Sequence, residues 1–259
     1  MPDIDSLPPG SFCWPELATS DQKAGTAFYT KLFDWAQHDN DMGPAGVYTV
    51  FKMRDRDVAA AASLRPEEKQ HGVPAHWNTY ISVANADAAV KRAQELGAKI
   101  LAPAFDVMDA GRMAVIADPT GAVFQVWQAN RTVGTRIQGE AGALCWTELY
   151  TRDTGAAEKF YSQMFGWSSK TGGTPPYTEL NLAGKGIGGM MAIQPEWGQM
   201  PPNWAPYFQV VDCDASAAKA TSLGANVGVK PNDIPNVGRF AMIADPQGAM
   251  FAIFQPKGR

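Results

Sequence analysis

Two stretches of the chain decide its fold because they are copies of each other: residues 12–35, FCWPELATSDQKAGTAFYTKLFDW, and residues 144–167, LCWTELYTRDTGAAEKFYSQMFGW. They align at a constant offset of 132 positions, with 11 identities in 24. A second pair, residues 111–129 and 238–256, aligns at an offset of 127 with 11 identities in 19. Matches of this extent indicate an internal duplication, so we expect two copies of one structural unit.

The duplication sets the expected domain organisation. We predict a tail over residues 1–11, a first domain over 12–129, a polar linker over 130–142 and a second domain over 143–256. Each predicted domain lies within the usual size range of an independently packed unit.

The apolar pattern of the first copy predicts two similar halves, each with a strand, a helix and further strands. Thr19, Ser20 and Asp21 offer N-cap side chains for the first helix, and Gly97 is a C-terminal cap for the second. The expected strands are 13–18, 48–53, 58–64, 78–83, 113–117, 122–128 and one near residue 100, and the second helix is 87–96. The order βαβββ therefore occurs twice per copy.

Composition narrows the class of protein. Of the 259 residues, 45% are hydrophobic and 19% are charged, which is typical of a globular protein that folds without a partner. The formal net charge of −4, without a Lys/Arg cluster, argues against nucleic acid as a partner. The polar, Pro-rich residues 1–10 predict neither a signal peptide nor a membrane anchor, and three scattered cysteines predict a reduced, cytoplasmic protein.

Several repeated strings resemble those of the vicinal oxygen chelate superfamily, which includes glyoxalases, bleomycin-resistance proteins and dioxygenases. These strings are Phe28-Tyr29, Phe160-Tyr161, Asp118-Pro119-Thr120-Gly121 and Asp245-Pro246-Gln247-Gly248. The added strings Gly111-Arg112 and Gly238-Arg239 are most similar to the two-domain glyoxalase branch. The resemblance implies an α+β fold of four βαβββ modules in two tandem domains, each a curved mixed sheet with helices on its convex face.

The resemblance also implies a divalent metal ion on each concave face. Counted from the strings above, its ligand positions fall on Trp14, Asn78, Gln125 and Ala61 or a neighbour in the first copy, and on Trp146, Ala205, Ala252 and Met190 in the second. Indole cannot ligate, and divalent ions prefer carboxylate, His or Cys ligands. The three histidines, His38, His71 and His76, are expected away from these positions. We therefore predict no metal and no other cofactor.

Strand alternation suggests what the concave faces contain instead. Residues two apart share a face, so Trp14 lies beside Glu16, and Trp146 beside Glu148. The predicted ligand-binding residues are Trp14, Asn78, Tyr80, Gln125, Trp127, Trp146, Tyr207 and Phe254, and the predicted catalytic residues are Glu16, Glu148, Arg112 and Arg239.

The two glutamates have two interpretations. In an aromatic cup, burial would disfavour the charged carboxylate, so Glu16 or Glu148 could act as a general acid or base. Alternatively, Glu16 pairs with Arg112 and Glu148 with Arg239, and the ion pairs only close the cups.

Three functions remain open from the sequence. The first is a metal-independent protein, monomeric or homodimeric, that binds a small aromatic or amphipathic molecule in an apolar cup. The second is a glyoxalase-like lyase or isomerase acting on methylglyoxal adducts, against which the missing Lewis-acid ligands count. The third is a metal-free enzyme, of cyclase, hydrolase or hydroxylase type, in which Glu16 or Glu148 moves the proton and Arg112 or Arg239 holds an anion.

Overall fold

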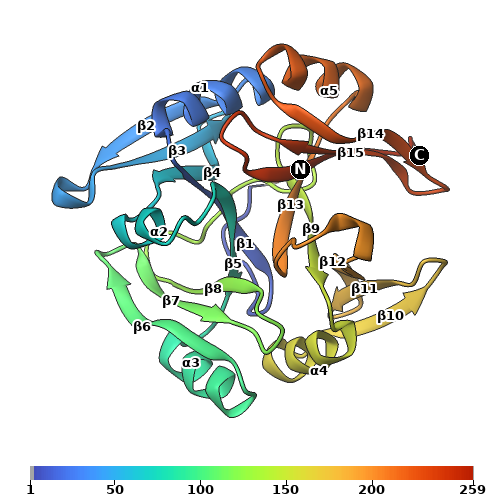
Figure 1. The fold of residues 1–259 in the computed structure, drawn as a ribbon. Coiled ribbons are helices and arrows are strands. Elements are labelled where there is room, and N and C mark those ends of the chain that lie inside the picture. The colour runs from blue at the N-terminus through green and yellow to red at the C-terminus, as the bar shows by residue number, and fades with distance from the viewer. Residues whose placement is uncertain (1–2, 259) are drawn as a thin grey trace.

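The computed structural model describes residues 3–258, and each copy of the repeat forms one eight-stranded mixed sheet (Figure 1). The first copy contains β1 (Phe12–Thr19), α1 (Gln22–Phe33), β2 (Ala36–Asp41), η1 (Gly43–Ala45), β3 (Val47–Met53), β4 (Arg56–Ser63), α2 (Pro66–Gln70), β5 (His76–Ser82), α3 (Ala86–Glu95), β6 (Lys99–Val107), β7 (Gly111–Ala117) and β8 (Val123–Ala129). The second contains β9 (Leu144–Thr151), α4 (Thr154–Phe165), β10 (Ser168–Gly172), β11 (Tyr177–Leu182), β12 (Lys185–Ala192), η2 (Pro195–Trp197), β13 (Asn203–Gln209), α5 (Cys213–Ser222), β14 (Asn226–Ile234), β15 (Gly238–Ala244) and β16 (Met250–Pro256).

The strand orders confirm the predicted α+β fold with two βαβββ modules per copy. The first sheet runs β2-β3-β4-β1-β5-β8-β7-β6, and the second runs β10-β11-β12-β9-β13-β16-β15-β14. In each sheet the two modules meet at an antiparallel pair, β1 with β5 or β9 with β13, and each of these four strands pairs on its other side with a parallel strand of its own module.

The helices begin where the sequence supplies a capping side chain. Asp21 accepts a hydrogen bond from the amide of Ala24 at the start of α1, and Asp153 does the same for α4. Both caps satisfy amides that the first helical turn leaves unpaired. The region predicted for the cap of α1 is thereby confirmed.

The two sheets pack back to back, and the hydrophobic cores cross from one copy to the other. One core joins the first module of the first copy to the second module of the second copy, and includes Tyr29, Phe51, Phe208 and Phe251. The other core joins the two remaining modules. Figure 1 accordingly shows α1 beside α5 at one end of the molecule and α3 beside α4 at the other. Neither copy therefore has a complete core of its own.

Buried polar chains run across this interface at two equivalent places. The indole of Trp77 donates to the hydroxyl of Tyr29 (3.0 Å), which donates to Asp245 in the turn of the other copy (3.0 Å). In the second place Trp204 donates to Tyr161 (2.9 Å), which donates to Asp118 (2.9 Å). The Phe-Tyr string of each copy thus contacts the Asp-Pro-x-Gly turn of the other copy.

The tail and the linker also join the copies. The indole of Trp167 donates to the carbonyl of Gly10, and that of Trp35 donates to the carbonyl of Gly142, both at 2.8 Å. In the linker, Thr135 and Ile137 are buried. These segments are therefore packed parts of the interface rather than loose connections.

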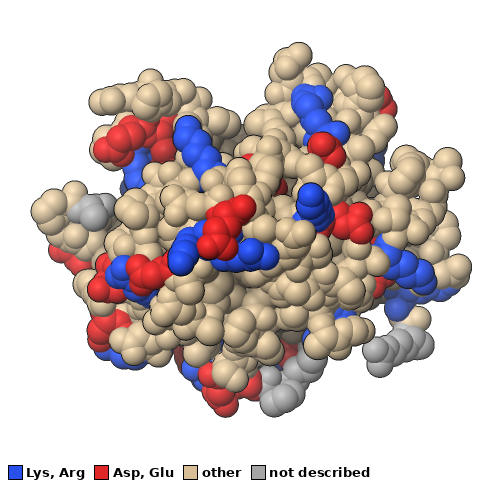
Figure 2. All heavy atoms as spheres, turned by 90° about the horizontal axis from the view of Figure 1, so that it is seen from below, with Lys and Arg blue, Asp and Glu red and all other residues tan. Residues whose placement is uncertain are grey.

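The surface carries charges of both signs. On the face drawn in Figure 2, basic and acidic side chains lie next to one another rather than in a patch of one sign. Within residues 3–258, no helix has both the length and the apolar composition that crossing a membrane requires.

We predict that Tyr29→Phe and Tyr161→Phe each lower the free energy of unfolding by about 1–3 kcal/mol. Each change removes the donor to a buried aspartate and the acceptor of a buried indole, and such groups are costly to leave unpaired. Urea unfolding of the two variants measures the effect. Unfolding free energies equal to that of the wild type would show that the crossed hydrogen bonds do not hold the copies together.

Candidate functional site

The side of the first sheet that faces away from the interface forms what we call the first cup. Trp14, Glu16, Asn78, Tyr80, Gln125 and Trp127 lie on this side, as the predicted strand alternation requires. Tyr48 and Met113 join them from β3 and β7. The cup therefore contains every site residue that we predicted in the first copy except Arg112.

Glu16 is the polar centre of the first cup. Its Oε2 accepts hydrogen bonds from the hydroxyls of Tyr48 (2.8 Å) and Tyr80 (3.1 Å), and its Oε1 accepts one from the Asn78 amide (3.2 Å). The side chain is half-buried, whereas Tyr80 is almost fully buried. Two strands, β3 and β5, thus present three donors to one carboxylate.

Burial and hydrogen bonding act on Glu16 in opposite directions. Burial raises the pKa of Glu16, because it disfavours the charged form, while the bonds from Tyr48, Tyr80 and Asn78 and the nearby His76 oppose the rise. Burial and the charge of Glu16 hold the pKa values of Tyr48 and Tyr80 well above the ordinary value. Both hydroxyls therefore stay protonated as donors.

The amides extend this arrangement along the floor of the cup. Asn78 Oδ1 accepts a hydrogen bond from Gln125 Nε2 (2.9 Å). Gln125 is 3% exposed, and its Oε1 has no hydrogen-bond partner within residues 3–258. Glu16, Asn78 and Gln125 form a row, which we call the polar row.

Aromatic side chains surround the polar row. The indole of Trp14 donates to the Tyr48 hydroxyl (3.0 Å), and that of Trp127 donates to the carbonyl of Thr132 (2.8 Å). The rings of Tyr80 and Trp127 meet edge to face, with centroids 6.3 Å apart. Leu7 of the tail packs against the same cluster. The predicted tryptophans are thus fixed as walls.

The equivalent second cup, on the outer side of the second sheet, is more apolar and more closed. Tyr150, Tyr207, Met242, Phe240 and Phe254 belong to its lining. The loop around η2 places Trp197 edge-on against Tyr150, and Met200 packs against the same cluster. Ala205 and Ala252 replace the two amides of the first copy, so there is no polar row.

Glu148 in the second cup has fewer donors than Glu16. Its Oε2 accepts from Tyr177 (2.9 Å) and more distantly from Trp146 (3.3 Å), while Oε1 is buried without a partner in the described chain. The side chain is 2% exposed, and this burial raises its pKa to about 8 despite the two hydrogen bonds. Glu148 is therefore mostly protonated at neutral pH.

The alternative interpretation, in which Arg112 pairs with Glu16, is wrong. Arg112 makes a bidentate ion pair with Asp87 at the start of α3 and a single ion pair with Asp106. Side chains alternate along β7, so Met113 lies in the cup and Arg112 lies on the opposite side of the sheet. The Gly-Arg string alone does not show on which face of the sheet the arginine side chain lies.

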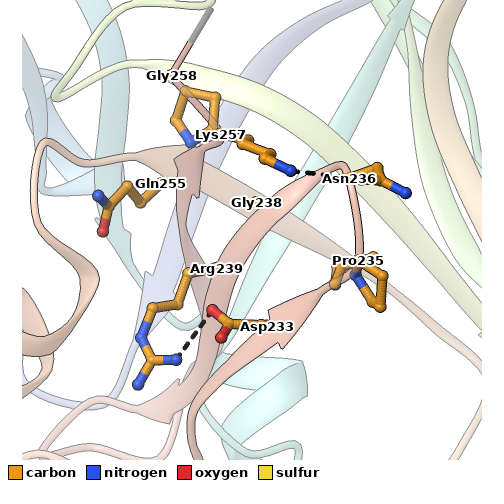
Figure 3. A pocket seen from close by; sticks show the side chains of 10 residues that line it. Asp233, Pro235, Asn236, Gly238, Arg239, Gln255, Lys257 and Gly258 are labelled. Carbon is orange, nitrogen blue, oxygen red and sulfur yellow. Dashed lines mark hydrogen bonds and ion pairs between the residues drawn. The ribbon is translucent and has the colours of Figure 1, made fainter.

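Arg239 repeats this correction in the second copy, since it pairs with Asp214 and Asp233 and not with Glu148. Figure 3 shows Arg239 beside Asp233 in a shallow pocket of about 450 Å³ at the edge of the second sheet. Lys257 and Asn236 also meet there. The charged groups of this pocket already have partners, and the pocket is separate from both cups.

Two of the three histidines lie on strands, and the third follows a short helix. His38 lies on the exposed edge strand β2, and His71 follows α2. His76 begins β5 and, by alternation, shares the face of Asn78 at the mouth of the first cup. Across the part of the chain that the structure describes, no three His, Cys, Asp or Glu side chains gather as a metal site would require.

Tyr48 and Tyr177 are functional candidates that the sequence reasoning missed. Each hydroxyl lies between a Trp and a Glu of its own copy, so Trp14-Tyr48-Glu16 and Trp146-Tyr177-Glu148 are equivalent triads. The only sequence signal is the dipeptide Tyr-Thr, which recurs at an offset of 129.

Comparisons with known proteins agree with this architecture. The family model of the Glyoxalase/Bleomycin resistance protein/Dioxygenase superfamily matches residues 12–126 and 143–253. The chain is 41% identical to "Putative glyoxylase CFP32" of Mycobacterium tuberculosis, over 99% of this chain and 98% of that protein. It is 36% identical to "Anthracycline biosynthesis protein DnrV" of Streptomyces peucetius, over 95% and 94%.

Solved structures share the fold at low sequence identity. A Mn(II)-bound glyoxalase from Novosphingobium aromaticivorans superposes with a TM-score of 0.67 at 13% identity, covering 95% of this chain and 82% of that one. A variant of homoprotocatechuate 2,3-dioxygenase from B. fuscum gives 0.69 at 14%, covering 98% and 73%. With the family match, the crossed modules and the two cups, the chain belongs to the glyoxalase/bleomycin resistance protein/dioxygenase superfamily, as its repeated strings predicted.

Proposed function

We propose that this glyoxalase-like chain is a small-molecule-binding protein whose first cup holds an aromatic or amphipathic ligand without a metal ion. The observation that carries the proposal is the half-buried Glu16 with its three donors. A carboxylate offers about four lone-pair sites, so one site on Oε1 is left for a ligand. Glu16 would therefore anchor the polar end of a molecule held between aromatic walls.

The walls favour an aromatic ligand. Trp14, Tyr48, Tyr80 and Trp127 line the cup, and rings of this kind stack on flat apolar molecules while their polar atoms fix orientation. The name of the Streptomyces relative connects that protein with anthracyclines, which are flat hydroxylated aromatic compounds. We extend to this chain only the class of flat aromatic ligand.

The donor set argues against a metal ion as the anchor. The polar row supplies one carboxylate and two neutral amides, whereas divalent ions prefer several carboxylate, His or Cys ligands. An ion at Glu16 would find one lone-pair site on Oε1, because the hydroxyls of Tyr48 and Tyr80 already donate to Oε2. A lyase acting on methylglyoxal adducts needs a Lewis acid and is therefore less well supported.

A metal-free enzyme is the second candidate, because the raised pKa of the half-buried Glu16 suits a general acid or base. Arg112 and Arg239 have no part in it, since both point away from the cups. A ligand that copurifies with the chain can be identified by native mass spectrometry. If the wild type converts that ligand to a product and Glu16→Gln binds it without conversion, the chain is an enzyme and not only a binding protein.

The second cup has a structural role in this proposal. Glu148 is enclosed beneath Tyr177, and an added Cβ at Gly189 would overlap the Tyr177 hydroxyl. This close approach leaves no room beside the carboxyl group on that strand. Ligand binding is therefore assigned to the first cup alone.

Glu16→Gln should weaken the binding of 2,6-dihydroxynaphthalene at least tenfold, measured by quenching of tryptophan fluorescence. Loss of a hydrogen bond to a charged group removes about 1.5–3 kcal/mol, and tenfold in affinity corresponds to about 1.4 kcal/mol. Glu148→Gln, the same change at the equivalent position, is the matched control and should alter affinity less than about twofold. Weaker binding in Glu148→Gln alone would place the site in the second cup.

The burial of Glu148 predicts a pH-dependent gain in stability for Glu148→Gln. The folded chain holds this proton up to about pH 8, compared with the ordinary value of 4.5, so wild-type stability should fall as pH rises through that interval. Glutamine removes this loss. The unfolding free energy of the variant relative to the wild type should therefore rise by about 3 kcal/mol between pH 5 and pH 8. A difference that stays constant in urea unfolding over this range contradicts the assigned protonation.

A further inference from the structure

We infer that Gln125 determines the specificity of the first cup by demanding a hydrogen-bond donor from the ligand, so that the site selects hydroxylated aromatic molecules over their carbonyl or ether counterparts. The inference rests on the proposed function, because it describes what that cup selects. It is carried by the direction of the hydrogen bonds along the polar row and by the unpartnered oxygen at its end.

The direction of the polar row is set at Glu16. Both Glu16 oxygens act as acceptors, since the hydroxyls of Tyr48 and Tyr80 donate to Oε2 and the Asn78 amide donates to Oε1. Asn78 must therefore turn its Nδ2 toward Glu16 and its Oδ1 toward Gln125. Gln125 in turn must donate through Nε2, which leaves its Oε1 as the free end of the row.

The free end of the polar row, Gln125 Oε1, is a hydrogen-bond acceptor without a donor. Gln125 Oε1 is buried and has no partner within the described residues, and a buried carbonyl without a hydrogen bond costs free energy. A ligand hydroxyl that reached it would regain that free energy, whereas an ether or carbonyl oxygen would not. The remaining lone-pair site on Glu16 Oε1 has the same preference, so both unpartnered acceptor positions of the row favour a hydrogen-bond donor.

The charges around the cup support a neutral donor rather than an anion. Arg112 lies on the opposite side of the sheet, paired with Asp87 and Asp106. Arg65, beside α2 at the cup mouth, pairs with Glu68. Within the described residues, both arginines already have acidic partners, and neither is free to pair with an anion at the polar row. A carboxylate or phosphate would therefore meet Glu16 without an unpaired arginine to compensate its charge.

The second copy provides an internal comparison. Its residues at the positions of Asn78 and Gln125 are Ala205 and Ala252, both buried. That sheet therefore keeps the Trp-Tyr-Glu triad without the amide row. The triad can form without the amides, so the amides of the first copy serve something other than the placement of the glutamate.

The test compares 2,6-dihydroxynaphthalene with 2,6-dimethoxynaphthalene, two flat probes that differ in their donors. The wild-type chain should bind the dihydroxy probe on the order of tenfold more tightly. Gln125→Met, which keeps the side-chain length but removes the acceptor, should reduce this preference to less than threefold. Gln37→Met, on the exposed edge strand β2, is the control and should keep the full preference.

A measurement on the unmodified chain keeps the test independent of the variant's folding. The side-chain amide signal of Gln125 in ¹⁵N NMR spectra should move when the dihydroxy probe is added and stay in place with the dimethoxy probe. Equal affinity of the wild type for both probes, or an unchanged preference in Gln125→Met, overturns the inference and leaves the proposed function standing. Binding of neither probe rejects the proposed function and the inference together.

Discussion

The rest of the molecule depends on a buried tyrosine of one copy donating to a turn aspartate of the other. Tyr29 reaches Asp245 and Tyr161 reaches Asp118, and each aspartate also accepts backbone amides of its own turn. The contact fixes a helix of one copy over the last strands of the other. Because it occurs in both directions, the two large hydrophobic cores are each built from both copies, and neither copy can move without opening a core.

This crossed packing explains how the two cups could diverge. The interface uses the inner faces of the sheets and the helices, so the outer faces are free of structural demands from the other copy. Both cups keep the Trp-Tyr-Glu triad, but only the first adds Asn78 and Gln125, which extend Glu16 into a polar row. The second replaces them with alanine and encloses Glu148. One scaffold thus carries a polar cup and an apolar one.

Much of this could be predicted from the sequence, because repeats and alternation are local signals. They located the four modules, the region 19–21 that contains the cap of α1, and the shared face of Trp14 and Glu16. They did not place β2, because its residues Ala36–Asp41 are polar and mostly exposed on a sheet edge and so lack alternation. The partner of Arg112 and the approach of Tyr48 to Glu16 depend on strand register and pairing, which a string of residues does not contain.

The central claim is that the first cup works through Trp, Tyr, Glu and amide side chains rather than through a metal ion. Elemental analysis of the chain, purified without chelators and then equilibrated with Zn, Ni, Fe or Mn and desalted, tests it most directly. We predict far less than one equivalent of any of these metals per chain, and the same result for Glu16→Gln. One equivalent that is retained by the wild type and lost in Glu16→Gln would contradict the account.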